Sequence, residues 1–197
     1  TPAANRRETV IAADVYRPGP LRTDFERLAS PATPMAEADI LSLLLKYFHA
    51  CLYPGSQEHP IGLKEISGLL GQFYELWSEG SPEKVLPLAG DYSAYPLRML
   101  TDLPRTGHIF RSIANRPLPP DMVHDPFLGL DIGTGSGILL AAAWFQAKRN
   151  GVGETRLYGF ELDSEISERT DALLRSLGVG QVMAVDARDP GVYAALP

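Results

Sequence analysis

Apolar side chains recur three and four residues apart through much of residues 33–114, the spacing of helices with one buried face. The clearest stretch begins at Thr33 and Pro34, an N-cap residue followed by a proline in the first turn, and ends near Cys51. Residues 1–32 carry few apolar clusters, so we expect a loosely ordered segment there. Further helical stretches are expected at residues 66–77, 95–103 and 108–114.

The pattern changes after a proline-rich linker at residues 117–120. Helical patterns with one apolar face then alternate with short apolar runs, which we expect to be strands, the first two of them buried. The apolar runs cover residues 129–132, 156–161 and 181–187, and the helical patterns cover residues 138–148 and 164–177. This alternation predicts an α/β fold, a Rossmann-like doubly wound parallel sheet with its first three strands present. The expected organisation is a loosely ordered segment over 1–32, a helical region and linker over 33–120, and the α/β domain over 121–197.

A glycine-rich turn follows the first apolar run. That run carries Asp131 near its end, and glycines then occupy alternate positions, at Gly133, Gly135 and Gly137. Glycines allow a sharp bend and let the backbone approach a ligand closely. The helix that follows directs its free N–H groups toward the turn. A turn of this kind, at the carboxyl edge of a parallel sheet, is typical of a site for a nucleotide-like ligand.

The spacing of the glycines narrows the choice of ligand. A dinucleotide fingerprint counted from Gly133 requires glycine at position 138, where this chain has Ile138, and counted from Gly135 it meets Leu140. A P-loop is excluded because no Gly-Lys-Ser/Thr follows the turn. The observed pattern is D-x-G-x-G-x-G, with the acid two residues before the first glycine. This pattern resembles the first motif of class I S-adenosylmethionine-dependent methyltransferases.

The resemblance covers about residues 126–189 and implies S-adenosylmethionine as the cofactor. In that family the glycine turn lies against the methionine and ribose, and the first acid orients the amino-acid end. An acid ending the second strand accepts the ribose hydroxyls, and an acid after the third contacts the adenine amino group beside a backbone N–H. Carried over, the cofactor-binding residues are Asp131, Gly133, Thr134, Gly135, Gly137, Glu161, Asp186 and Ala187. Asp163, past the end of the second run, is the weaker candidate for the ribose contact, and either Asp163 or Ser164 is interpreted as the N-cap of the helix that follows.

Composition restricts the partners. The chain is 45% hydrophobic and 21% charged, which is ordinary for a globular protein. Its net charge of −6 gives no basic field for an extended nucleic-acid duplex. No apolar run is long enough for a membrane helix, and the lone Cys51 favours a reducing, cytoplasmic compartment. His49 and Cys51 lack a second ligand pair, so no metal site is expected.

The chain departs from the family beyond Asp186. A methyltransferase core has seven strands, of which we find three, so we expect a sheet truncated at the C-terminus and prone to self-association along its free edge. The fourth strand, which carries acceptor-facing residues in the family, is not found, so no catalytic base can be named. The acceptor is left open between a small molecule, a protein and an RNA. A non-catalytic methyltransferase-like binding or scaffold module is the alternative function, and a nicotinamide-dependent oxidoreductase is the third.

Side chains of the helical region are candidates for contact with the acceptor. In methyltransferases a helical region ahead of the first motif commonly covers the cofactor or forms the acceptor pocket. For any single side chain, packing between helices or solvation is the simpler interpretation. The candidates are the segment at residues 91–96 and a basic and aromatic run that contains Arg98, Arg105, His108, Phe110, Arg111 and Arg116.

Overall fold

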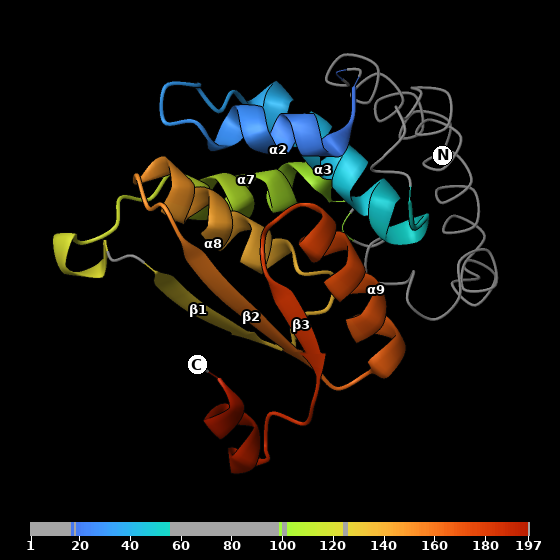
Figure 1. Ribbon diagram of the computed structural model, residues 1–197. Helices are drawn as coiled ribbons and strands as arrows, with labels where there is room; N and C mark the ends of the chain where they lie inside the picture. The colour runs from blue at the N-terminus through green and yellow to red at the C-terminus, as the bar shows by residue number, and fades with distance from the viewer. Residues whose placement is uncertain (1–16, 18, 56–98, 100–101, 124–125, 197) are drawn as a thin grey trace. The chain divides into compact units, whose positions relative to one another are not determined.

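The computed structural model describes residues 17, 19–55, 99, 102–123 and 126–196 (Figure 1). The chain divides into two compact units. The first holds residues up to Arg27 together with Met35–His108, and the second holds Leu28–Pro34 together with Ile109–Pro197. The expected helix at 66–77 and most of the one at 95–103 lie outside the described residues. No helix in the described part of the chain is long and apolar enough to cross a membrane.

The first unit contains α2 (Leu21–Ala29) as far as Arg27, and the whole of α3 (Glu37–Leu52). The expectation of loose order over 1–32 is therefore wrong for α2. Leu21, Phe25 and Leu28 recur at helical spacing and are at most 1% exposed, so this short helix has a buried face despite its charged residues.

The start of α3 corrects a second expectation, because the helix begins at Glu37 and not at Thr33-Pro34. Its N-cap is Ala36, which provides no side-chain hydrogen bond. The N–H of Thr33 instead donates to the carbonyl of Ser30, so the residues before the helix form a separate turn. A residue of a type favoured at N-caps does not determine where a helix starts when that residue belongs to a preceding turn.

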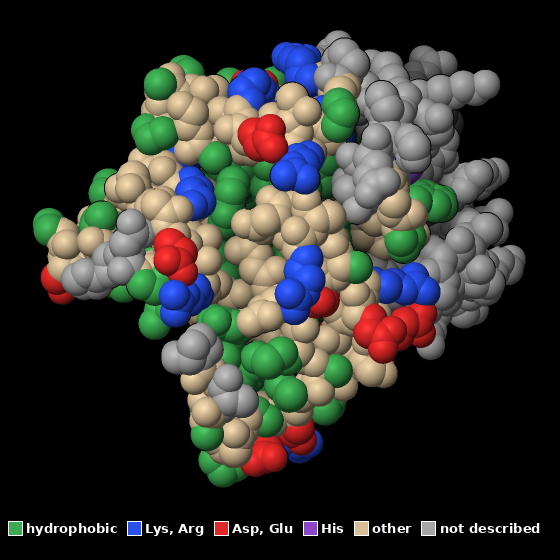
Figure 2. All heavy atoms as spheres, viewed as in Figure 1, with side chains coloured by type: hydrophobic (Ala, Val, Ile, Leu, Met, Phe, Trp, Pro, Cys, Tyr) green, Lys and Arg blue, Asp and Glu red, His purple; other side chains and the backbone are tan. Residues whose placement is uncertain are grey.

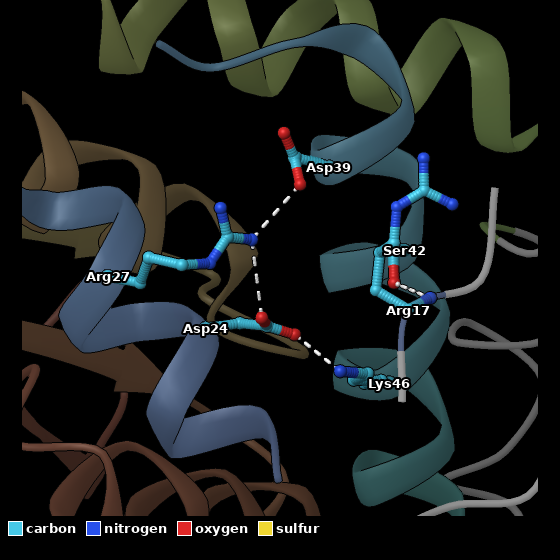
Figure 3. Close-up of polar contacts among 6 residues, drawn as sticks. All are labelled: Arg17, Asp24, Arg27, Asp39, Ser42 and Lys46. Carbon is cyan, nitrogen blue, oxygen red and sulfur yellow. Dashed lines mark hydrogen bonds and ion pairs between the residues drawn. The ribbon is translucent and has the colours of Figure 1, made fainter. Parts of the chain in front are cut away.

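Charged side chains link α2 to α3 within this unit (Figure 3). The Nζ atom of Lys46, whose side chain is 0% exposed, lies 2.5 Å from Oδ2 of Asp24. The guanidinium of Arg27 donates to both Asp24, at 3.4 Å, and Asp39, at 3.0 Å. The backbone N–H of Arg17 donates to Oγ of Ser42 at 2.8 Å.

The second unit contains the predicted α/β fold. Three parallel strands lie in the order β1-β2-β3, and one helix connects each strand to the next (Figure 1). The elements are β1 (Phe127–Ile132), α8 (Ile138–Arg149), β2 (Thr155–Glu161), α9 (Ser164–Ser176) and β3 (Gln181–Ala184). The predicted strand–helix–strand–helix–strand order is confirmed, and α8 and α9 begin at or near the expected residues.

The C-terminal end of α8 is fixed by polar and aromatic contacts of the same unit. Nη1 of Arg149 donates to the carbonyls of Leu28, Ser30 and Thr33 at 2.8–2.9 Å. Phe145 of α8 packs edge-on against Phe110, with ring centroids 5.4 Å apart. Phe110 belongs to α7 (Leu103–Ala114), which begins earlier than the expected 108–114.

The two faces of the sheet differ in how they are covered. The helices α8 and α9 pack against one face, where Leu157 of β2 is 1% exposed. Side chains alternate between faces along a strand, so every second residue of β1 points to the other face. Those residues are Leu128, Leu130 and Ile132, and they are 58%, 38% and 58% exposed. The expectation that the first strand is buried is therefore wrong for one face, because α8 and α9 both cover the opposite one.

A short C-terminal 3-10 helix, η5 (Pro190–Ala195), covers a part of that second face. Its Tyr193 packs edge-on against Phe160 of β2, with ring centroids 5.4 Å apart, and Phe160 is 1% exposed. Figure 2 shows hydrophobic side chains gathered between the strands and the C-terminal segment on the viewed face. The apolar face of the sheet is thus covered beside β2 and exposed at β1.

Candidate cofactor-binding site

The glycine turn between β1 and α8 has the left-handed backbone that its sequence predicts. Gly133, Gly135 and Gly137 have φ values of +71°, +51° and +72°. Side chains other than glycine adopt such angles at a cost. At Gly137 space is also limiting, because a Cβ there would lie 2.8 Å from Leu174 and 2.9 Å from Thr170. A Cβ at Gly133 would meet nothing within 4 Å, so this residue borders open space.

Asp131 lies at the entrance to the turn. The hydroxyl of Thr134 donates to Oδ2 of Asp131 at 2.8 Å, which bridges the end of β1 and the middle of the turn. Burial raises the pKa of the Asp131 carboxyl above its ordinary value, and the hydrogen bond from Thr134 opposes that rise. The carboxyl group is therefore partly desolvated and is oriented by one neighbouring hydroxyl.

Glu161 brings the end of β2 to the same turn. Its Oε2 accepts the N–H of Gly135 at 3.0 Å, and its Oε1 accepts the N–H of Asp163 at 3.1 Å. A carboxylate offers about four acceptor positions, so further donors can still reach it. The predicted register of the second strand, which ends at Glu161, is confirmed.

Asp163 has the structural role expected for it. Its carboxylate accepts the N–H groups of Glu165 and Ile166 at 2.9 Å and 3.0 Å, so it is the side-chain N-cap of α9. Two neighbouring acids therefore have different tasks: Glu161 faces the turn and Asp163 begins a helix.

Asp186 follows a shorter strand than expected. We predicted a strand over 181–187 that ends in this acid, whereas β3 ends at Ala184. The N–H of Val185 still donates to the carbonyl of Glu161 at 2.9 Å, and the chain then turns, with Asp189 N–H donating to the carbonyl of Asp186. Asp186 thus lies in a loop just beyond the sheet edge where Glu161 ends.

The Asp186 loop is held by local contacts. Hydrogen bonds from the side chain and the backbone N–H of Arg188 lower the pKa of Asp186 to about 2. The hydroxyl of Tyr193 donates to the carbonyl of Ala187 at 2.9 Å. This hydrogen bond does not involve the N–H of Ala187. No hydrogen bond between described residues links Asp186 to the glycine turn, in contrast to Asp131 and Glu161.

The structure adds two side chains that the sequence did not single out. Leu162 follows Glu161 directly and is 67% exposed, an apolar surface beside a polar cluster. Thr170 of α9 is 0% exposed, and its hydroxyl donates to the carbonyl of Gly135 at 2.7 Å. The sequence feature that could have indicated Thr170 is its hydroxyl on the apolar face of α9, which otherwise carries residues such as Leu173 and Leu174.

Other candidate sites have simpler interpretations. Phe110 is 2% exposed and packs on Phe145, so it belongs to the core and not to an exposed acceptor surface. Cys51 is buried, and the ring of His49 packs at a tilt against that of Tyr53, with ring centroids 4.8 Å apart. Within the described ranges no group of three or more His, Cys, Asp or Glu side chains could hold a metal ion.

Comparisons with models of protein families, with curated proteins and with solved structures find no match to this chain. The resemblance to methyltransferases therefore stays a prediction from the motif.

Proposed function

We propose that this chain binds S-adenosylmethionine at the carboxyl edge of its sheet and belongs to a methyltransferase. One observation carries the proposal: Glu161, which ends β2, accepts a hydrogen bond from Gly135, the middle glycine of the turn after β1. The D-x-G-x-G-x-G turn and the acid of the next strand therefore form one polar cluster, which is the arrangement that the motif resemblance requires.

The residues present fit this cofactor. The open space beside Gly133 would receive the methionine portion, and Asp131 would orient its ammonium group. The remaining acceptor capacity of Glu161 suits two ribose hydroxyls. Asp186 and the N–H of Ala187 suit the edge of the adenine, and the exposed Leu162 suits its face.

The electrostatics favour a cationic cofactor over a dinucleotide. S-adenosylmethionine carries positive charge on its sulfonium and ammonium groups, and the proposed site offers the carboxyl groups of Asp131, Glu161 and Asp186. A dinucleotide needs free N–H groups for its pyrophosphate. In this turn the N–H of Gly135 already donates to Glu161, and those of Gly133 and Thr134 donate to the carbonyl of Phe160.

The bound cofactor would supply an electrophilic methyl group on sulfur, displaced in line by the acceptor. The protein's contribution to such a step is mainly alignment and exclusion of water. In this proposal Glu161 and the turn fix the ribose, and Asp131 fixes the amino-acid end. The acceptor and any base that deprotonates it belong to parts of the site that these residues do not define.

Isothermal titration calorimetry tests the proposal. We expect wild-type protein to bind S-adenosylmethionine and its demethylated product, S-adenosylhomocysteine, and to bind NAD far more weakly. Glu161→Ala removes a charged acceptor worth about 1.5–3 kcal/mol, so it should weaken binding of either sulfur nucleoside about ten- to a hundredfold.

Asp163→Ala is the matched control, because it removes the neighbouring acid from the helix N-cap. It should lower the free energy of unfolding by about 1 kcal/mol and leave the affinity nearly unchanged. Binding of NAD without a response to either sulfur nucleoside would refute the proposal. Binding of both nucleosides without methyl transfer in the presence of candidate acceptors would favour the non-catalytic module.

A further inference from the structure

Gly135 is held at both of its backbone polar groups by elements distant in sequence. Its N–H donates to Oε2 of Glu161 at 3.0 Å, and its carbonyl accepts the hydroxyl of Thr170 at 2.7 Å. The first contact comes from the end of β2 and the second from the middle of α9. The glycine turn is therefore clamped between a strand and a helix.

Packing alone does not require the hydroxyl of Thr170. The residue is 0% exposed, and its methyl group would lie 2.9 Å from a Cβ built at Gly137. Valine would present the same volume to Gly137 and to the rest of the core. A buried hydroxyl is costly unless it is hydrogen-bonded, so its presence on an apolar helix face indicates a polar task.

The two hydrogen bonds to Gly135 restrain glycines, whose backbones can adopt many conformations. Gly135 and Gly137 have left-handed φ angles, and glycines lose more backbone freedom than other residues when they become ordered. Loss of the Thr170 contact would free the peptide group between Gly135 and Ser136. Rotation there would also disturb the N–H of Gly135 and hence the carboxylate of Glu161.

We propose that Thr170 is a positioning residue of the cofactor site: from the buried face of α9, its hydroxyl fixes the carbonyl of Gly135 and so pre-organises the turn and Glu161 for the ligand. The ligand part of this inference rests on the proposed function. Thr170 acts through Gly135 and Glu161 and has no contact of its own with the ligand. Pre-organisation raises affinity by lowering the ordering cost at binding.

The test compares Thr170→Val, which deletes the hydroxyl at constant shape, with Thr170→Ser, which keeps it. Calorimetry with S-adenosylhomocysteine, well below each melting temperature, should show affinity reduced about three- to tenfold in Thr170→Val and near wild type in Thr170→Ser. Thr106→Val is the matched control, because Thr106 is also buried, at 8% exposed, and its hydroxyl contacts Sδ of Met99 and not a residue of the turn. It should leave the affinity unchanged.

A second readout needs no ligand. Hydrogen exchange of the Gly135 amide, followed by NMR, should be faster in Thr170→Val than in wild type and restored in Thr170→Ser. Unchanged exchange, or unchanged affinity with a lower melting temperature, would overturn the positioning role and leave a structural one. If wild type binds neither sulfur nucleoside, the proposed function fails, and the exchange data still decide whether Thr170 orders the turn. Should Thr170→Val not fold, Thr170→Ala, which also deletes the hydroxyl, takes its place in both measurements.

Discussion

The charge of Asp131 lowers the stability of the fold but could serve to bind a ligand. Its carboxyl is partly desolvated, and burial raises its pKa. For an acid whose pKa is raised by folding, the native state binds more protons than the unfolded state. Stability therefore falls as the pH rises through the folded-state pKa, and the charged form at neutral pH destabilises the protein. A charge kept at such a cost is a candidate for a ligand contact.

Asp131→Asn removes that charge and keeps an oxygen that can accept the hydrogen bond from Thr134. We expect the variant to have a higher free energy of unfolding than wild type at pH 7. The difference should shrink as the pH falls through the folded-state pKa and vanish well below the ordinary pKa of aspartate, where both side chains are neutral. Urea unfolding of both proteins from pH 3 to pH 7 measures this. A variant that is less stable at pH 7 would show that the carboxylate charge stabilises the fold.

The residues that could be predicted from sequence are those whose roles depend on neighbours in the chain. Glu161 ends a strand and Asp163 caps the helix that follows, and local pattern indicated both. Thr170 could not be predicted in this way, because its hydrogen bond to Gly135 spans 35 residues and depends on how α9 packs. The end of β3 was misjudged for a related reason: Asp186 turns the chain through its contacts with Arg188 and Asp189.

At the scale of elements, the predicted α8, β2 and α9 were accurate because their ends carry strong local signals. Gly151 and Gly178 follow the two helices with φ of +82° and +70°, where glycine is favoured. By contrast α2 has only 9 residues, and propensity alone rarely stabilises a helix that short. Its stability depends on tertiary burial of Leu21 and Phe25, which composition does not reveal.

The Asp24–Lys46 pair between α2 and α3 gives an element-scale prediction (Figure 3). Asp24→Ala takes one carboxylate away from the fully buried Lys46 ammonium, so we expect a loss of about 3–5 kcal/mol in the free energy of unfolding. The double variant Asp24→Ala/Lys46→Met removes both charges and should recover a large part of that loss. Chemical denaturation followed by circular dichroism measures all three proteins.

Glu26→Ala serves as the control for that experiment. Glu26 lies on the same helix and pairs with Arg22, but both side chains are 67% exposed, so little change is expected. An Asp24→Ala variant no less stable than Glu26→Ala would mean that the buried pair contributes nothing. Failure of Lys46→Met to recover stability would show that the Lys46 ammonium has other stabilising contacts.

At the scale of the whole molecule, strand order and crossover pattern could be predicted, but the burial of the sheet could not. The run at residues 129–132 is apolar enough to suggest a strand covered on both faces. In the structure α8 and α9 cover one face, and among the described strands β1 has a neighbour on one side only. Burial of a strand depends on the layers around it, which a local pattern does not contain.

The exposed side chains of β1 predict how these 197 residues behave when expressed by themselves. Leu128, Leu130 and Ile132 form an apolar strip on β1, which is an edge strand among the described strands, and exposed apolar edges recruit other strands. We expect concentration-dependent self-association in sedimentation velocity and enhanced fluorescence of a hydrophobic dye. Leu130→Lys should reduce both, because a lysine on an edge strand is costly to bury against a second chain.

Ile109→Lys is the control for the strip, since Ile109 is 43% exposed on α7 and is not part of the sheet. It introduces the same charge and should leave dye binding and association close to wild type. Both replaced side chains are exposed, so neither variant should change the free energy of unfolding by more than about 0.5 kcal/mol. If the two lysines reduced dye binding and association equally, the association would depend on net charge and not on the β1 strip. A wild-type protein that stays monomeric at high concentration and binds no dye would show that the β1 strip does not drive contact between chains.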